Sequence, residues 1–189
     1  MKILVIAEHD NTSLKGSTNS TIAAAKEISS DISVLVAGHS CSSVSDEAAS
    51  LDGVTSVMLA DSSTYENFLA EDIANLIVSI SDDFEYILAP ATTFGKNFLP
   101  RVAAILDSQQ ISEITEVVSA DTFKRPIYAG SCIATVKTLE PKKIISVRST
   151  AFDGVTKGES QASVTDVSPT DSLNAVSYTH LTLPTILLV

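Results

Sequence analysis

The stretch that most constrains the fold runs from residue 84 to residue 106 and reads FEYILAPATTFGKNFLPRVAAIL. Its residues 86–89 form an apolar run of strand length, which Pro90 and small residues separate from apolar residues at helical spacing. This order is typical of one strand–loop–helix unit in a parallel α/β sheet. Ligands and partners of such sheets gather at the carboxyl ends of the strands. We therefore predict that the loop after residue 89 is the functional surface of the chain.

Six residues of this segment are the candidates for contact with a partner. They are Thr92, Thr93, Gly95, Lys96, Asn97 and Arg101. Pro100 lacks a backbone donor, and its ring is strongly unfavourable deep inside a helix. The regular helix is therefore expected to begin near Phe98 or Leu99, with residues 95–97 as the loop that precedes it. Gly95 is expected to adopt a backbone conformation that other residues avoid.

Two functions stay open for this loop. A loop that feeds a helix can bind an anion through backbone amides and one lysine, which would make the chain a nucleotide-binding α/β domain that uses the loop at Gly95. The phosphate-loop pattern GxxxxGK[ST] is absent, however, and a lone Gly-Lys pair before a helix is weak evidence. The favoured alternative is that Lys96 and Arg101 make polar contacts at the helix end or with another subunit.

The preceding chain alternates strand and helix patterns. Residues 2–7 form a continuous apolar run, which is typical of a central strand with helices on both faces. Further strands are predicted at residues 32–37 and 55–60, and helices at residues 21–28, 44–51 and 69–81. A β-α order of this kind requires right-handed parallel crossovers. The predicted fold class is α/β, with a Rossmann-like, mostly parallel sheet and helices on both faces.

The pattern changes after residue 110. Short β-prone runs lie at residues 114–118, 126–128, 134–139 and 144–147, separated by turn residues. They predict extra strands that extend the sheet, some of them antiparallel. From residue 154 to residue 174 the chain is rich in Gly, Ser, Thr and Asp, which indicates a mostly extended linker with one strand at residues 162–167.

Charge and cysteine usage exclude several classes of function. A formal net charge of -11 argues against nucleic acid, because contact with phosphates requires clustered Lys and Arg. Cys41 and Cys132 lie far apart without metal-ligand spacing, so neither a metal site nor a disulfide is expected. Cys41 has no basic neighbour and is interpreted as a structural thiol. The opening MKILVIAEHD resembles no targeting segment, so we expect a soluble, cytoplasmic bacterial protein without a membrane partner.

An acid and an imidazole follow the first predicted strand, at Glu8 and His9. Such a pair at a strand end can transfer protons. No nucleophile or metal partner lies nearby in the sequence, so an ordinary polar loop is the favoured interpretation. A small enzyme that works through these two residues stays as an alternative hypothesis.

Several segments together resemble one known family, the electron transfer flavoprotein alpha subunit. The resemblance lies in FGKNFLPRVAAIL and the ISEI that follows it, in YAGSCIATVKT, and in VRSTAFD near residue 150. It covers residues 1 to about 174 and corresponds to the amino-terminal domain of the family, whose fold is of the adenine-nucleotide alpha hydrolase type. It implies an electron carrier rather than an enzyme.

The same resemblance implies a set of partners and a cofactor. In the family, the alpha and beta subunits form a heterodimer around one FAD, which carries electrons from dehydrogenases to a quinone oxidoreductase of the respiratory chain. The flavin is held mainly by a carboxyl-terminal domain with SGGRG-type and VGQTG-type motifs, and neither occurs in this chain. No cofactor is therefore expected for this fragment, and no catalytic, cofactor-binding or metal-binding residue is assigned.

The carboxyl end has a composition unrelated to the rest. Residues 176–185 read VSYTHLTLPT and resemble a translated sequencing adaptor. We expect residues 176–189 to be a non-native tail, and the gene to continue past residue 174 into a flavin-binding domain. The predicted organisation is an α/β domain at residues 1–150, followed by a linker at residues 151–175 toward the missing domain.

Overall fold

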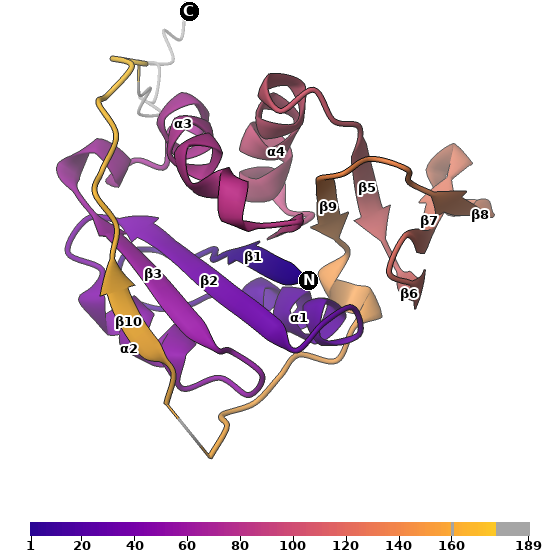
Figure 1. Ribbon diagram of the computed structural model, residues 1–189, viewed down its shortest axis with the longest axis horizontal. Helices are drawn as coiled ribbons and strands as arrows, with labels where there is room; N and C mark the ends of the chain where they lie inside the picture. Colours follow the sequence, from indigo (N-terminus) through magenta and orange to yellow (C-terminus); the bar gives the residue numbers. More distant parts are fainter. Residues whose placement is uncertain (160, 177–189) are drawn as a thin grey trace, which may run out of the picture.

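A parallel sheet of seven strands forms the centre of the computed structural model, which describes residues 1–159 and 161–176 (Figure 1). The strands are β1 (Lys2–Ile6), β2 (Asp31–Gly38), β3 (Ser56–Asp61), β4 (Tyr86–Pro90), β5 (Gln110–Ile114), β9 (Lys143–Val147) and β10 (Ser163–Asp166). The helices are α1 (Gly16–Lys26), α2 (Ser42–Ala49), α3 (Ala70–Ile80) and α4 (Thr93–Ile105). Short 3-10 helices lie at Ser63–Tyr65, Ser81–Asp83, Tyr128–Gly130 and Ser149–Ala151. The predicted α/β fold class is confirmed.

The strand order in this sheet is β10-β3-β2-β1-β4-β9-β5, and every neighbouring pair is parallel. β1 is central, as predicted: Val5 pairs with Val34 of β2 on one side and with Leu88 of β4 on the other. The chain builds outward from β1 through β2 to β3 and then returns to β1 to place β4. The direction of winding therefore reverses between β1 and β4, which is where α/β sheets of this type hold their ligands.

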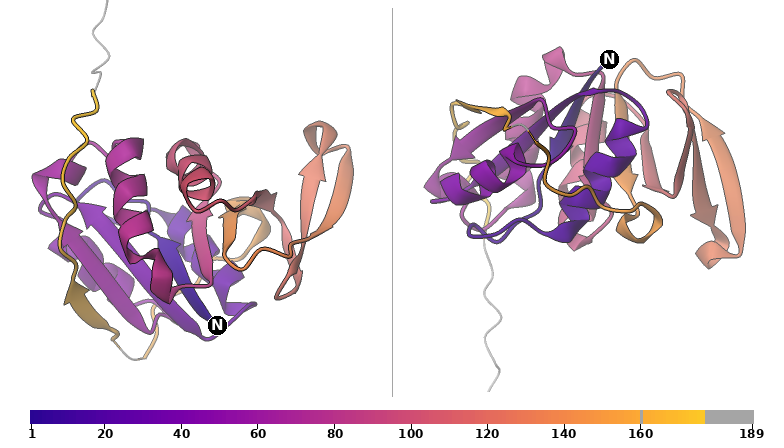
Figure 2. Two further views of the ribbon diagram at one scale, coloured as in Figure 1. Left: turned by 45° about the horizontal axis from the view of Figure 1, so that its top comes forward. Right: turned by 90° about the horizontal axis from the view of Figure 1, so that it is seen from below.

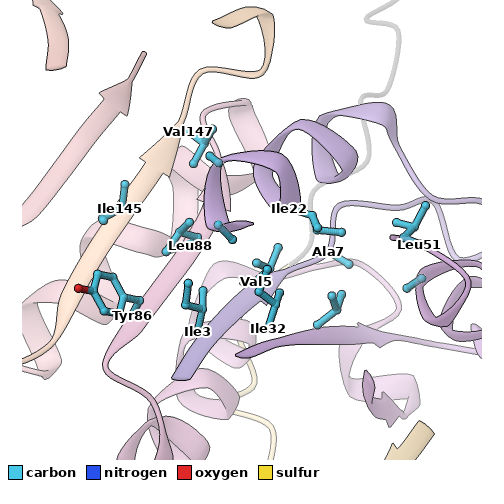
Figure 3. Packing of buried hydrophobic residues seen from close by; sticks show 14 of the residues in the cluster. Ile3, Val5, Ala7, Ile22, Ile32, Leu51, Tyr86, Leu88, Ile145 and Val147 are labelled. Atoms are coloured by element: carbon cyan, nitrogen blue, oxygen red, sulfur yellow. The ribbon is translucent and has the colours of Figure 1, made fainter. Parts of the chain in front are cut away.

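Two apolar cores lie on the two faces of the sheet. Ile3 and Val5 of β1 point into the core under α1 and α2, whereas Leu4 and Ile6 point into the core under α3 and α4. Figure 3 shows the first of these cores, with Ile22 of α1 packed over the strands. Burying one such side chain contributes about 1.5–3 kcal/mol. Because both faces are covered, the apolar runs of the strands need no polar alternation.

The predicted start of α4 is wrong. The helix begins at Thr93 rather than at Phe98 or Leu99, so residues 95–97 are helical and Pro100 lies well inside the helix. Pro100 and Lys96 are both exposed, so water can reach the Lys96 carbonyl, which has lost its helical donor at Pro100. The unfavourable proline is offset by the apolar side chains that the helix buries against the sheet. α1 likewise begins earlier than predicted, at Gly16.

A separate antiparallel sheet stands beside β5 (Figure 2). Its strands are β6 (Glu116–Ser119), β7 (Thr122–Ile127) and β8 (Cys132–Lys137), with β7 in the middle. The predicted single run at 114–118 is therefore split between two sheets, because Glu113 has a positive φ of 56° and the pairing of β5 with β9 is irregular there. Phe123 of β7 is fully buried in the core under α1 and ties the small sheet to the main one.

The segment after residue 153 packs against the domain and adds the edge strand β10, so the strand expected at residues 162–167 is confirmed. Residues 168–173 then cross toward α3. There the backbone amide of Thr170 donates to the Tyr65 hydroxyl at 2.9 Å, and that of Leu173 donates to the buried carboxylate of Asp72 at 2.8 Å. The expected non-native tail lies outside the described residues except for its first residue. Within residues 1–159 and 161–176, no helix is long and apolar enough to cross a membrane.

Candidate functional site at the carboxyl edge of the sheet

Glu8 occupies the point where the winding of the sheet reverses. Its Oε2 accepts hydrogen bonds from Ser17 Oγ at 2.7 Å and from Thr92 Oγ1 at 2.9 Å. Ser17 lies in the first turn of α1, and Thr92 immediately precedes α4. The backbone amide of Glu8 also donates to Thr18 Oγ1 at 2.9 Å. One carboxylate of the chain therefore joins the amino ends of two helices on neighbouring strands.

We call the place between β1 and β4 where the winding reverses the switch point. The contacts of Glu8 determine what can bind there. The amino ends of helices attract anions through their free amides and dipoles, and phosphate groups are the usual ligands there. Here a negative side chain already lies between α1 and α4 and uses the hydroxyls that a phosphate would need. A second anion would meet like-charge repulsion unless Glu8 moved away. The geometry therefore disfavours a phosphate at this point.

His9 faces a different environment from Glu8. Its ring is buried and meets the Phe68 ring edge-on, with the ring centroids 5.1 Å apart, and its Nδ1 accepts from the backbone amide of Asn11 at 3.1 Å. Nε2 is buried without a hydrogen-bond partner in the described part of the chain. Loss of solvent lowers the pKa of His9 below its ordinary value, so the imidazole is neutral at pH 7. Glu8 and His9 thus do not form the acid–imidazole pair that an enzyme would use.

Gly95 is required for a different reason than the one expected. It is buried inside α4 and has no positive φ, unlike Gly53 and Gly130. A Cβ at this position would come closer than 3.0 Å to the carbonyl oxygen of Pro90 and to within 3.1 Å of its carbon. The absence of a side chain lets the first turn of α4 approach the end of β4. Gly95 is therefore a packing residue and not part of a phosphate-binding loop.

Lys96 belongs to a charged group that we call the Glu113 cluster, formed by Lys96, Glu113 and Arg148. Lys96 Nζ lies 2.6 Å from Glu113 Oε1, and an Arg148 guanidinium nitrogen donates to Oε2 at 2.7 Å. Hydrogen bonds from Lys96 and then from Arg148 lower the pKa of the Glu113 carboxyl. The irregular backbone of Glu113 is held by Ser146, whose Oγ accepts from the Glu113 amide at 2.9 Å. The cluster joins α4, β5 and the end of β9.

The remaining candidates are distributed around α4. Arg101 pairs with Glu71 of α3 at 3.0 Å, on the side of the helix away from the Glu113 cluster. Thr93 and Asn97 are exposed. The structure therefore brings Thr92 to the switch point and Lys96 to β5, and it does not bring Lys96 and Arg101 together. Both cations have partners within the chain; the sequence predicted polar contacts for them but did not identify Glu113 and Glu71.

Three charged residues near this edge were missed as site residues. Arg148 directly follows β9 and Glu113 lies near the end of β5, so both share the edge of the sheet with Thr92. The rule that parallel strands end at one edge could have found them. Arg125 of β7 lies on the same face of its strand as Phe123. The sequence of β7, TFKRPI, does not alternate regularly between polar and apolar residues, so it does not indicate which way Arg125 points.

The two cysteines lie in different environments. Cys41 is buried, and desolvation, followed by the nearby charge of Asp61, raises the pKa of its thiol to about 11. Its interpretation as a structural thiol is confirmed. Cys132 is exposed on β8, and both cysteines are free. Within residues 1–159 and 161–176, no group of three or more His, Cys, Asp or Glu side chains could hold a metal ion.

A parallel sheet of this strand order, with its switch point closed by a carboxylate, defines a Rossmann-like domain without an open phosphate site there. The model of the electron transfer flavoprotein domain matches residues 3–172. The chain therefore belongs to the electron transfer flavoprotein family.

Proteins similar to this chain carry the name of one subunit of that family. The electron transfer flavoprotein subunit alpha of Pseudomonas aeruginosa is 54% identical over 173 residues, which are 91% of this chain and 56% of that protein. The mitochondrial subunit alpha of Dictyostelium discoideum is 52% identical, over 79% of this chain and 44% of its own length. The subunit alpha of Bradyrhizobium diazoefficiens is 47% identical, over 85% and 51%. The chain thus spans about half the length of these relatives.

The flavin implied by the family does not fit the switch point of this chain. The pyrophosphate of a dinucleotide would need the amino ends of α1 and α4, where Glu8 is bound to Ser17 and Thr92. In the Glu113 cluster, Lys96 and Arg148 each already bind the carboxylate of Glu113.

Proposed function

We propose that this chain is the amino-terminal, partner-binding half of an electron transfer flavoprotein alpha subunit. In this role it forms a heterodimer with a beta subunit and does not catalyse a reaction itself. The redox chemistry belongs to FAD, which accepts electrons from dehydrogenases and passes them to a quinone oxidoreductase. Residues 92–101 and the charged residues around them contribute to the surface that meets the beta subunit.

The observation that carries this proposal is the family match across residues 3–172, combined with the closed switch point at Glu8. The family match supports the class of protein. The closed switch point supports the view that this domain does not hold the flavin itself. A domain whose phosphate position is filled by its own carboxylate serves as a support for chemistry that takes place elsewhere. Bacterial relatives at 54% and 47% identity support a bacterial, cytoplasmic setting for the proposal.

The structure around Gly95 disfavours the alternative of a nucleotide-binding domain. It depended on a loop at residues 95–97 that binds an anion through backbone amides and Lys96. Residues 95–97 are instead helical, Gly95 is packed on Pro90, and Lys96 is paired with Glu113. The same proposal therefore predicts that AMP and ATP do not bind the chain measurably in calorimetry.

Assembly with a beta subunit tests the proposal directly. The chain and the beta subunit of Pseudomonas aeruginosa are expressed together, and only the chain carries an affinity tag. We expect the two to copurify and to remain together in gel filtration. In a second preparation, residues 1–174 replace the matching half of the Pseudomonas aeruginosa alpha subunit, and we expect this chimera to form a yellow heterodimer with FAD.

The chain alone provides the control for the flavin. It should purify without yellow absorbance, whereas the chimeric heterodimer should keep it after gel filtration. Failure of both the chain and the chimera to bind the beta subunit would end the proposal. Tight binding of AMP or ATP to the chain alone would restore the nucleotide-binding alternative.

A further inference from the structure

Arg125 is a half-buried cation for which the described part of the chain provides no ion-pair partner. It lies on β7 opposite Ala134 of β8 and shares its face of the strand with the buried Phe123. Its Nε is buried and has no hydrogen-bond partner, and its guanidinium makes no ion pair among the described residues. A buried N–H of a guanidinium without an acceptor is unfavourable, because it has lost water and gained no hydrogen bond. The domain therefore has an incomplete contact at Arg125.

A hollow of about 380 Å³ opens beside this arginine, and we call it the Arg125 hollow. It is lined by Glu113, Arg125, Arg148 and the turn from Pro126 to Gly130. Arg148 and Lys96 already share the carboxylate of Glu113. Two cations thus bind this carboxylate and a third, Arg125, lines the same hollow, in a chain whose net charge is -11. The local charge favours an additional negative group.

An aromatic side chain of the turn that lines the hollow points into solvent. Tyr128 is 79% exposed. Tyr128 and Ala129 also hold positive φ angles, which most residues avoid. Exposed Tyr beside Arg is the composition that protein–protein interfaces concentrate at their centres. The surface around the hollow therefore matches a protein partner better than a small free anion.

The position of the hollow indicates which partner it meets. The small sheet β6–β8 stands at the β5 end of the molecule, whereas β10 and residues 168–173 lie at the opposite end (Figures 1 and 2). The segment that leads out of the domain toward residue 176 is thus far from the hollow. A separate chain is better placed than the segment after β10 to fill the hollow.

We propose that the Arg125 hollow receives an Asp or Glu side chain of the beta subunit, and that Arg125 is the anchor of this contact. The inference rests on the proposed function and adds to it the surface and the chemistry of the contact. The incoming carboxylate accepts hydrogen bonds from Arg125, and Tyr128 packs over the contact and excludes water. The partner thereby supplies the guanidinium of Arg125 with an acceptor that the described residues do not provide.

Opposite changes in stability and affinity provide the test. Arg125→Met keeps the apolar stem and removes the charge, so the chain alone should unfold at the same or a higher temperature. The dissociation constant for the beta subunit, measured by calorimetry with the full chain, should rise by about thirty-fold or more, which corresponds to roughly 2 kcal/mol. Lys124→Met is the matched control, because Lys124 lies next to Arg125 but on the other face of β7, paired with Glu116. It should change the dissociation constant by less than about two-fold.

A second variant keeps the test independent of folding at residue 125. Tyr128 is mostly exposed, so Tyr128→Ala should leave the unfolding temperature unchanged and weaken binding by about ten-fold. Binding of Arg125→Met and Tyr128→Ala within two-fold of the parent chain would overturn the inference and leave the proposed function standing. Loss of stability in Arg125→Met together with unchanged binding of Tyr128→Ala would show a structural role only and would also overturn it. Failure of the parent chain to bind the beta subunit would overturn both proposals.

Discussion

Replacing Gly95 by Ala tests the close approach of α4 to β4. In an exposed helix, Ala in place of Gly stabilises by about 0.8–1.0 kcal/mol. Here the new Cβ would overlap the backbone carbonyl of Pro90, an atom that cannot move aside as a flexible side chain could. α4 would have to shift away from the sheet, and Phe98 and Leu99 would lose part of their packing. Overpacking costs about 1–3 kcal/mol and loosened core side chains add to it, so we expect a loss of about 3 kcal/mol or more.

The measurement is urea unfolding of the full chain, monitored by circular dichroism. In thermal unfolding of a domain of this size, a loss of about 3 kcal/mol lowers the melting temperature by about 6–12 °C. Gly16→Ala is the matched control, because Gly16 also lies in the first turn of a helix and a Cβ there would meet nothing within 4 Å. That variant should be neutral or slightly more stable. If Gly95→Ala unfolds within 0.5 kcal/mol of the parent chain, a threshold near the usual spread for neutral surface changes, the steric argument is wrong.

Three further outcomes follow from named contacts. Burial holds the pKa of His9 below the unfolded value of about 6.5, so the unfolded chain binds the extra proton first and the free energy of unfolding falls as pH drops through that value. In urea unfolding at a series of pH values, His9→Gln should remove this dependence on pH, and His39→Gln should keep it. Lys96→Ala should weaken heterodimer assembly by about 1–3 kcal/mol, because it releases Glu113 beside the Arg125 hollow. Arg101→Ala, on the α3 side of α4, should weaken assembly less. Equal dissociation constants for the two variants would contradict the placement of the beta subunit on the Lys96 side of α4. Asp72→Ala should cost about 1–3 kcal/mol and speed hydrogen exchange at the Leu173 amide; an unchanged exchange rate would show that the carboxylate does not hold that segment.

Most of the fold could be predicted because it follows from apolar periodicity. The unbroken run at residues 2–7 indicated a strand covered on both faces, and β1 is indeed the centre of the sheet. The start of α4 could not be predicted from Pro100 alone. Its cost competes with the burial of Phe98 and Leu99, and only the three-dimensional packing shows that the burial prevails.

The candidate site was predicted in place but not in its contacts. Thr92 and Lys96 lie at the carboxyl edge of the sheet, as the strand–loop–helix pattern indicated. Their partners Glu8 and Glu113 are 84 and 17 residues away in the sequence, and the pairing with Glu113 depends on an irregular backbone that no local pattern announces. Side-chain pairs across elements require the register of the strands, which sequence periodicity does not supply.

The edge strand β10 has a consequence for the newly made chain on the ribosome. β10 covers the outer edge of β3, yet about 100 residues separate the end of β3 from the end of β10. At the usual pace of synthesis, the free backbone groups along β3 wait roughly 5–20 s for their partner strand. Unpaired strand edges recruit other chains. During that interval the nascent domain would present a template for misassembly, and a chaperone that shields the β3 edge would be most useful before residue 166 has emerged.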